Sequence, residues 1–119
     1  MCEKRAGKEA RLRKPAEFRA VYSNGDRYDG RYMTVFIRKN QLGFHRYGIT
    51  VSRKTAKQAA KRNRMKRLLR ETIRLSGDVC ERVPEGFDWV FNAKKSLLEV
   101  GLRESLEDFR RVVSAIKVC

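Results

Sequence analysis

The chain has 119 residues, the size of one domain, and carries a formal net charge of +15. Its three cysteines lack paired spacing and His45 is its one histidine, which argues against a disulfide framework, a zinc site and histidine-based catalysis. No apolar run approaches the roughly 18 residues of a membrane span, and the N-terminus lacks the apolar region of a secretory signal. We therefore expect a cytoplasmic protein. This charge makes a polyanion its natural partner, nucleic acid first and an anionic membrane second, and of the two we predict nucleic acid and no membrane partner.

The positive charge is uneven along the chain. Residues 1–52 hold 12 basic and 5 acidic side chains, residues 53–74 hold 10 and 1, and residues 75–119 hold 7 and 8. The polyanion is therefore expected to meet the first two-thirds of the chain, and the last third to form scaffold. Residues 1–14 contain almost no large apolar side chains, which predicts a flexible basic arm ahead of one domain over 15–119.

A short helix is expected after the arm. Pro15 suits a first helical turn, and Asn24-Gly25 stops the helix. Its apolar stripe consists of Phe18, Val21 and Tyr22.

Two strands are expected next. Residues 31–39 alternate, with apolar character on both faces, as in a central strand. One face carries Met33, Val35 and Ile37, and the other carries Tyr32, Thr34 and Phe36. Residues 47–52 alternate again, and we expect the two strands to pair as a hairpin, with His45 in the turn between them.

The next helix is the most basic segment. Thr55 and Gln58 form a T-x-x-Q capping box that predicts its start, and Gly77 predicts its end. The apolar face consists of Met65, Leu68, Leu69, Thr72 and Ile73. The opposite face carries Asn63, Arg67, Arg70 and Arg74, with Ala56 and Ala59 at its start, and is flanked by Arg62, Arg64 and Lys66. The small alanines would let a ligand backbone approach closely.

The last third predicts a strand and a helix. The strand over 85–93 places Phe87, Trp89 and Phe91 on one face. The apolar stripe of the helix consists of Leu102, Leu106, Phe109, Val113 and Ile116, and its outer face of Glu104, Glu107, Asp108, Arg110 and Arg111. Helix, strands, helix, strand and helix together predict one α+β domain with a sheet.

The basic helix face has two interpretations. A charged helix face is usually only solvated, but such faces mix both signs, and like charges four residues apart repel one another. The many arginine side chains of this face favour a polyanion site, because each guanidinium can contact phosphate oxygens through two N–H groups at once. Composition does not separate RNA from DNA, but a helix-turn-helix needs a second helix where residues 47–52 form a strand.

The aromatic residues Phe18, Tyr22 and Phe36 also have two interpretations. Pattern alone favours ordinary core; the alternative is a platform on which unpaired bases stack. Arg11, Arg13 and Lys14 lie nearby in sequence and would supply phosphate contacts. We find no catalytic residues, because His45 has no partner in sequence and the acidic residues are scattered; Asp26 and Asp29 are better explained as turn residues than as a metal pair.

Three segments resemble the bacterial ribonuclease P protein subunit. "KRNRMKRLLRE" (61–71) is similar to its arginine-rich signature helix, "RLRKPAEFRAVYSNG" (11–25) to its opening helix, and "RYGITVSRKTAKQAAKRNR" (46–64) to its strand, loop and helix. The resemblance covers about residues 11–117. It implies an α-β-β-β-α-β-α sandwich similar to domain 2 of ribosomal protein S5, with an additional short strand near 26–30 and a left-handed β-α-β crossover through the arginine helix.

The resemblance also implies a function, namely removal of the 5′ leader from precursor tRNA by a large catalytic RNA that uses Mg²⁺. The protein would bind no cofactor itself and would have the catalytic RNA and precursor tRNA as partners, with no role for DNA. The implied contacts to the RNA subunit are Arg53, Lys54, Lys57, Arg62, Asn63, Arg64, Lys66, Arg67 and Arg70. The implied contacts to the leader are Arg11, Arg13, Lys14, Phe18, Tyr22 and Phe36, which replaces core as the preferred interpretation of the three aromatic residues. A stand-alone structural RNA-binding protein remains the alternative.

Overall fold

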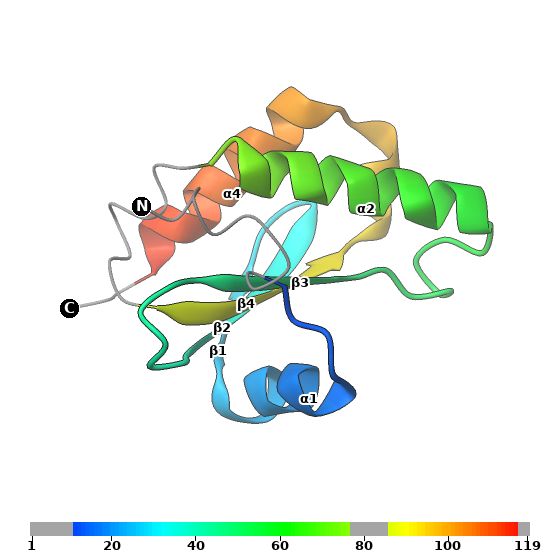
Figure 1. Ribbon diagram of the computed structural model, residues 1–119. Helices are drawn as coiled ribbons and strands as arrows, with labels where there is room; N and C mark the ends of the chain where they lie inside the picture. Colours follow the sequence, from blue (N-terminus) through cyan, green and yellow to red (C-terminus); the bar gives the residue numbers. More distant parts are fainter. Residues whose placement is uncertain (1–10, 77–85, 117–119) are drawn as a thin grey trace.

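Helices cover both faces of one four-stranded sheet in the computed structural model, which describes residues 11–76 and 86–116 (Figure 1). In chain order the elements are α1 (Pro15–Asn24), β1 (Asp26–Asp29), β2 (Met33–Lys39), β3 (Arg46–Thr50), α2 (Ala59–Arg74), β4 (Phe87–Ala93), the 3₁₀ helix η3 (Lys95–Glu99) and α4 (Leu102–Ala115). Helices α2 and α4 lie on one face of the sheet and α1 lies on the other. The predicted α-β-β-β-α-β-α order is confirmed, including the short strand near 26–30.

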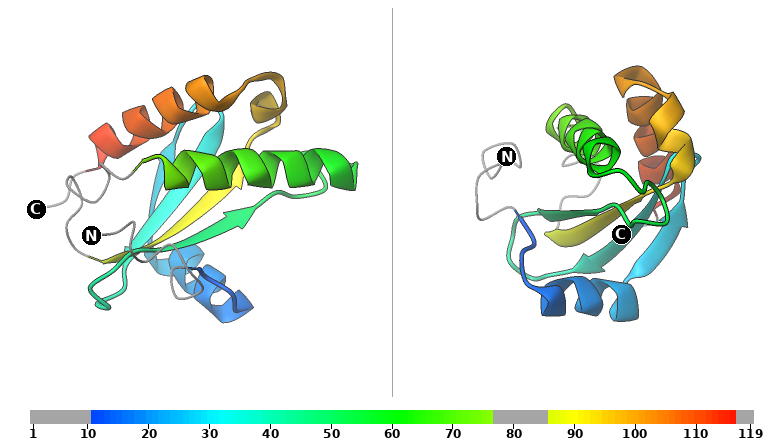
Figure 2. Two further views of the ribbon diagram at one scale, coloured as in Figure 1. Left: turned by 45° about the horizontal axis from the view of Figure 1, so that its top comes forward. Right: turned by 90° about the vertical axis from the view of Figure 1, so that its right-hand side faces the viewer.

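The sheet order is β1-β2-β4-β3, so the predicted hairpin between β2 and β3 is wrong. Strand β4 lies between them, antiparallel to β2 and parallel to β3, and Phe91 has Val35 on one side and Ile49 on the other. The alternating sequence pattern of two consecutive strands is the same whether the strands pair directly or a third strand lies between them. The chain passes from β3 through α2 to β4, and this crossover is left-handed (Figure 2).

The main core lies between the sheet and the pair α2 and α4. The alternation predicted for β2 and β4 is confirmed, because Met33, Val35, Ile37, Phe87, Trp89 and Phe91 are all buried in it. Phe109 of α4 packs against two of these rings, with its centroid 5.2 Å from that of Phe91 and 5.9 Å from that of Trp89. Met65 and Leu69 of α2 complete this core, so the exposed face of α2 is fixed by burial of the opposite face.

Helix ends differ from the predictions in two places. Helix α2 begins at Ala59 without a side-chain cap, so the Thr55–Gln58 capping box is wrong. Thr55 instead belongs to a turn, where its backbone N–H donates to the Ser52 hydroxyl over 3.2 Å. Helix α4 ends at Ala115, so Ile116, which was predicted in its apolar stripe, is its C-cap. Gly77, the predicted end of the arginine-rich helix, lies outside the described residues.

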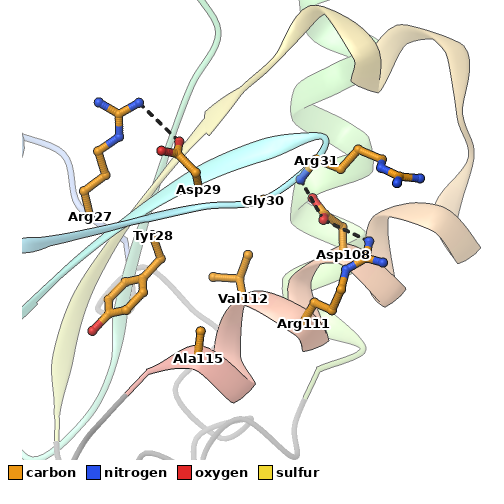
Figure 3. A pocket seen from close by; sticks show the side chains of 9 residues that line it. All are labelled: Arg27, Tyr28, Asp29, Gly30, Arg31, Asp108, Arg111, Val112 and Ala115. Atoms are coloured by element: carbon orange, nitrogen blue, oxygen red, sulfur yellow. Dashed lines mark hydrogen bonds and ion pairs between the residues drawn. The ribbon is translucent and has the colours of Figure 1, made fainter.

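Asp108 is the clearest error of the sequence analysis, since it lies not on the outer face of α4 but 1% exposed beneath the β1–β2 turn. Its two carboxylate oxygens accept the backbone N–H groups of Arg31 and Tyr32, each over 2.8 Å. Arg111 also donates to it, over 3.1 Å, and Figure 3 shows this bond together with the one from Arg31. A Cβ at Gly30 would come within 2.6 Å of this carboxylate, so the turn fits around it only with glycine there. Next to it, a pocket of about 520 Å³ opens between β1 and α4.

His45 lies in the connection between β2 and β3, as predicted, but it is buried, 1% exposed. Its Nδ1 accepts the backbone N–H of Phe87 over 3.2 Å and the indole N–H of Trp89 over 3.0 Å. This histidine therefore satisfies two buried donors at the start of β4, which is a structural role.

Candidate nucleic-acid interface

The outward face of α2 presents basic side chains without neutralising partners. Asn63, Arg67 and Arg70 are exposed on it, opposite the buried Met65 and Leu69. Within the residues that the structure describes, neither Arg67 nor Arg70 has a side-chain partner. Their guanidinium groups therefore keep all their donors available to an external anion.

Three other arginines of α2 have partners within the protein. Arg62 donates through Nη1 to the backbone carbonyl oxygens of Ala56 (2.9 Å) and Lys57 (2.8 Å), and so ties the preceding loop to the helix. Arg64 donates to the carbonyl oxygen of Leu98 over 3.0 Å. Arg74 pairs with Glu71, whose pKa is lowered by this hydrogen bond. The predicted basic face is therefore compensated at its C-terminal end, whereas Arg62 and Arg64 bond to carbonyl oxygens and keep their charges.

Ala56 corrects one detail of the predicted face. It is only 5% exposed and packs in the core, because α2 begins three residues later than the predicted cap at Thr55 implies. Of the two alanines expected to admit a ligand backbone, only Ala59 is exposed.

The loop from β3 to α2 extends the basic surface. Arg53, Lys54 and Lys57 are all exposed in it, and Figure 1 shows it joining the end of β3 to the start of α2 at one edge of the molecule. The half-buried Lys66 lies on α2 itself. The fold thus brings the predicted RNA-subunit residues onto one helix and the loop that leads into it.

The three predicted aromatic residues meet on the other face of the sheet, beside α1. Tyr22 is 39% exposed and contacts Phe36 edge to face, with centroids 4.9 Å apart and ring planes 84° apart. Phe18 and Phe36 are half-buried and pack against the small cluster of Leu12, Val21 and Val90. A Cβ at Gly48 would lie 2.6 Å from the Phe18 ring, so this glycine lets Phe18 rest on the sheet. The rings belong partly to the core and partly to the surface.

A row of polar side chains that the sequence pattern did not predict crosses the sheet next to these rings. The register places Thr34, Asn92 and Thr50 side by side on three strands. The Tyr22 hydroxyl donates to Asn92 Oδ1 over 2.8 Å, and Thr50 donates to the same oxygen. Thr50 is the last residue of β3, so the row leads from the rings to the basic loop. Only the pairing of three strands reveals it, although the alternation already placed Asn92 opposite Phe91 and Trp89.

Arg27 adds a cation near the same rings. Its guanidinium carbon lies 5.9 Å from the centroid of Phe36, and its Nη2 lies 3.2 Å from Asp29 Oδ1. Hydrogen bonds from the Thr34 hydroxyl and from Arg27 lower the pKa of Asp29. Asp29 is thus engaged by neighbouring donors, and among the described residues no group of three or more His, Cys, Asp or Glu side chains has metal-site geometry.

Residues 11–14 were predicted as part of a flexible arm, which is wrong for this stretch. Arg11 forms a parallel bridge with Tyr47, and the Leu12 N–H donates to the Tyr47 carbonyl over 2.9 Å, so the segment lines the outer edge of β3. Leu12 is buried, whereas Arg11, Arg13 and Lys14 are exposed. The three basic residues therefore stand ahead of α1 in a defined backbone conformation, and residues 1–10 lie outside the described residues.

No helix among the described residues has the length and apolar character needed to cross a bilayer.

Comparison with known proteins agrees with this architecture. The family model described as Ribonuclease P matches residues 6–117. The ribonuclease P protein component of Clostridium botulinum (strain Langeland) is 43% identical over 89 residues, which cover 75% of this chain and 78% of that protein. That of Clostridioides difficile is 35% identical over 102 residues, covering 86% and 87%.

Solved structures show the same fold. The ribonuclease P protein from Thermotoga maritima superposes with a TM-score of 0.77 at 32% identity, covering 91% of this chain and 98% of that one. The protein from Staphylococcus aureus gives a TM-score of 0.78 at 25% identity, covering 93% and 98%. With a family match over nearly the whole chain and relatives at this level of identity, the chain belongs to the bacterial ribonuclease P protein family.

Proposed function

We propose that this subunit binds the catalytic RNA of ribonuclease P through α2 and its preceding loop, and holds the 5′ leader of precursor tRNA on the opposite sheet face. The observation that carries the proposal is the continuity of this surface: the Tyr22–Phe36 pair leads through Asn92 and Thr50 to the basic loop. One folded RNA and one single strand would thus be held on adjoining surfaces.

The α2 face suits a folded RNA because its charges are fixed on a rigid helix. Arg67 and Arg70 offer forked donors to phosphates. Asn63 lies between these arginines and the loop, and its amide can both donate and accept hydrogen bonds at a 2′-hydroxyl or a base edge. Arg62 would act in part through the loop, since its bonds to Ala56 and Lys57 hold Arg53 and Lys54 close to the helix start. Lys57, Arg64 and Lys66 complete the proposed contact set.

The aromatic face suits a single strand. Base stacking on aromatic rings contributes about 1–3 kcal/mol per base and tolerates any sequence. Tyr22 offers an exposed ring supported by Phe36, and Phe18 lies one helical turn earlier. Arg11, Arg13 and Lys14 would neutralise the phosphates of the same strand.

The chemistry is proposed to lie in the RNA. This chain would supply substrate affinity to a cytoplasmic endoribonuclease, with the required Mg²⁺ bound by the RNA and precursor tRNA as the substrate. The basic side chains of the protein would lower the Mg²⁺ concentration at which the RNA holds its substrate, because these side chains and Mg²⁺ both neutralise phosphate charge.

Reconstitution tests the proposal. Adding the protein to a bacterial ribonuclease P RNA at low Mg²⁺ is expected to restore cleavage of precursor tRNA, and a variant with Arg67 and Arg70 replaced by alanine to restore much less. Arg110→Ala, an exposed arginine of α4 far along the chain from α2, is the matched control and is expected to behave as wild type. RNA binding without any gain in cleavage would instead indicate a stand-alone structural RNA-binding protein.

A further inference from the structure

Three charged side chains meet beneath the first turn of α1, outside both proposed contact sets. Arg46, the first residue of β3, donates through Nε and Nη2 to the two oxygens of Asp88 over 2.8 and 2.7 Å. Its Nη1 donates to Glu17 Oε2 over 2.9 Å. Asp88 is almost fully buried, and the Arg46 and Glu17 side chains are only 20% and 25% exposed, so solvent screens the three charges weakly.

The second oxygen of Glu17 holds the segment that precedes the helix. Glu17 Oε1 accepts the backbone N–H groups of Arg13 and Lys14, both over 2.9 Å. Together with the bond from Leu12 N–H to the Tyr47 carbonyl, this fixes the backbone of residues 12–14 at both ends. Glu17 thus connects β3 and β4, through Arg46, to the backbone that carries the basic side chains.

We propose that Glu17, held by Arg46, is a positioning residue for leader binding: it fixes Arg13 and Lys14 relative to Phe18, the residue that follows it. This role rests on the leader-binding function proposed above. A single-stranded RNA contacted by cations at 13–14 and by a ring at 18 needs both at a fixed spacing. Without the anchor, the strand would have to order residues 13–14 on binding, which reduces affinity.

Glu17→Gln separates this role from folding. A carboxylate has two acceptor oxygens, whereas glutamine has one oxygen and an NH₂ group that only donates. Glutamine can therefore accept from Arg46 or from the two backbone N–H groups, but not from both. Asp88 keeps its two hydrogen bonds to Arg46 in this variant, so no buried charge loses its main partner.

Glu104 provides a matched control in the same chain. It occupies the same position in the first turn of α4, where its Oε1 accepts the Gly101 N–H over 3.2 Å and its Oε2 lies 3.8 Å from Arg103. Glu104→Gln thus makes the same chemical change at a helix start on the other face of the sheet. Any general effect of removing a first-turn glutamate appears in both variants.

The experiment measures binding of precursor tRNA and mature tRNA to the reconstituted holoenzyme. Glu17→Gln is expected to weaken precursor binding about tenfold, with mature tRNA and the catalytic RNA bound as by wild type, and Glu104→Gln to change none of the three. In a background with Arg13 and Lys14 replaced by alanine, Glu17→Gln is expected to have little further effect, because the groups it positions are gone. In the free protein, amide exchange at residues 13 and 14 is expected to accelerate only in Glu17→Gln.

Three results would overturn the inference, and they are distinguishable. Equal weakening of precursor and mature tRNA, or full additivity with the alanine background, would make Glu17 a structural residue only while leaving the leader site intact. A wild-type holoenzyme that binds precursor and mature tRNA equally would contradict the proposed leader site and this role together.

Discussion

The rings of Tyr22 and Phe36 meet edge to face, with centroids 4.9 Å apart. An exposed tyrosine is thereby supported by a half-buried phenylalanine from a central strand, so the outer ring is held in place before any ligand arrives. Such a rigid aromatic surface loses little side-chain entropy when a base stacks on it.

Phe36→Leu tests this surface. Leucine keeps most of the apolar contact with Val21 and Val90, so the free energy of unfolding should fall by less than about 1.5 kcal/mol. Affinity of the holoenzyme for precursor tRNA should fall by about 1 kcal/mol or more, roughly fivefold, because ring support and stacking are lost. Tyr22→Phe, which keeps both rings, should have a smaller effect on binding. Equal losses of affinity for precursor and mature tRNA would contradict leader binding on this face.

Arg67 and Arg62 should differ as alanine variants although both lie on α2. Arg67→Ala removes a side chain without an intramolecular partner among the described residues, so thermal stability should be unchanged while affinity for the catalytic RNA falls. Arg62→Ala also removes hydrogen bonds to two carbonyl oxygens, so it should cost about 1 kcal/mol of unfolding free energy as well. Thermal unfolding and RNA titration separate the two. A destabilised Arg67→Ala would assign that residue a structural role.

The salt dependence of RNA binding measures the number of phosphates neutralised. If about six are contacted, log affinity should fall with log salt at a slope of roughly −4 to −5, and Arg67→Ala should make the slope shallower by about one. Titrations at several KCl concentrations give both values. A flat response would contradict an electrostatic interface on α2.

Asp108→Asn should destabilise the fold without altering RNA recognition. The carboxylate accepts two backbone N–H groups and one arginine, whereas the asparagine NH₂ would face a donor. Leaving a buried donor unpaired costs about 1–3 kcal/mol, which urea denaturation would detect. Arg111→Ala removes a largely exposed partner and should cost less. Stability unchanged in Asp108→Asn would mean that the turn adjusts around the amide.

Glu17 should make stability depend on pH. Its pKa lies below the ordinary 4.5 because the N–H groups of Lys14 and Arg13 and the charge of Arg46 favour the carboxylate. A lowered folded-state pKa means that the unfolded chain binds more protons, so this contribution is complete above about pH 5 and declines as the pH falls through the lower folded-state pKa. The stability difference between wild type and Glu17→Gln should therefore shrink as the pH falls below about 5. A difference that stays constant as the solution is acidified would show that the ionised form is not what the fold uses.

Local pattern predicted the helices and strands because each buries one face with its own period, as Val35 and Trp89 illustrate. The pairing of β2 with β4 was not predictable from that pattern, since alternation records which face is buried and not which strand lies alongside. Asp108 and Glu17 share the same difficulty. Each is a charged residue on an amphipathic helix whose carboxylate accepts two backbone N–H groups. The donors to Asp108 lie more than 70 residues away in sequence, and the donors to Glu17 lie in the segment just before the helix.

The binding residues divide in a similar way. The arginine-rich helix and the aromatic residues are visible in the sequence and the fold gathers them as expected, whereas their contacts with RNA stay predictions. Asn92 and Thr50 were missed because only strand register places them beside Tyr22. Arg62 and Arg64 were grouped with free cations, and only the structure reveals their carbonyl partners.

Strand β4 is the central partner of both β2 and β3, yet among the described residues it is the last strand to leave the ribosome. Until residue 93 has emerged, β3 lacks the strand with which it pairs, and α2 has only part of the surface on which its apolar side packs. Topologies of this kind postpone folding until distant segments meet. A nascent chain would thus expose its most cationic stretch before that stretch has a rigid shape, and acquire a selective RNA-binding surface only near the end of synthesis.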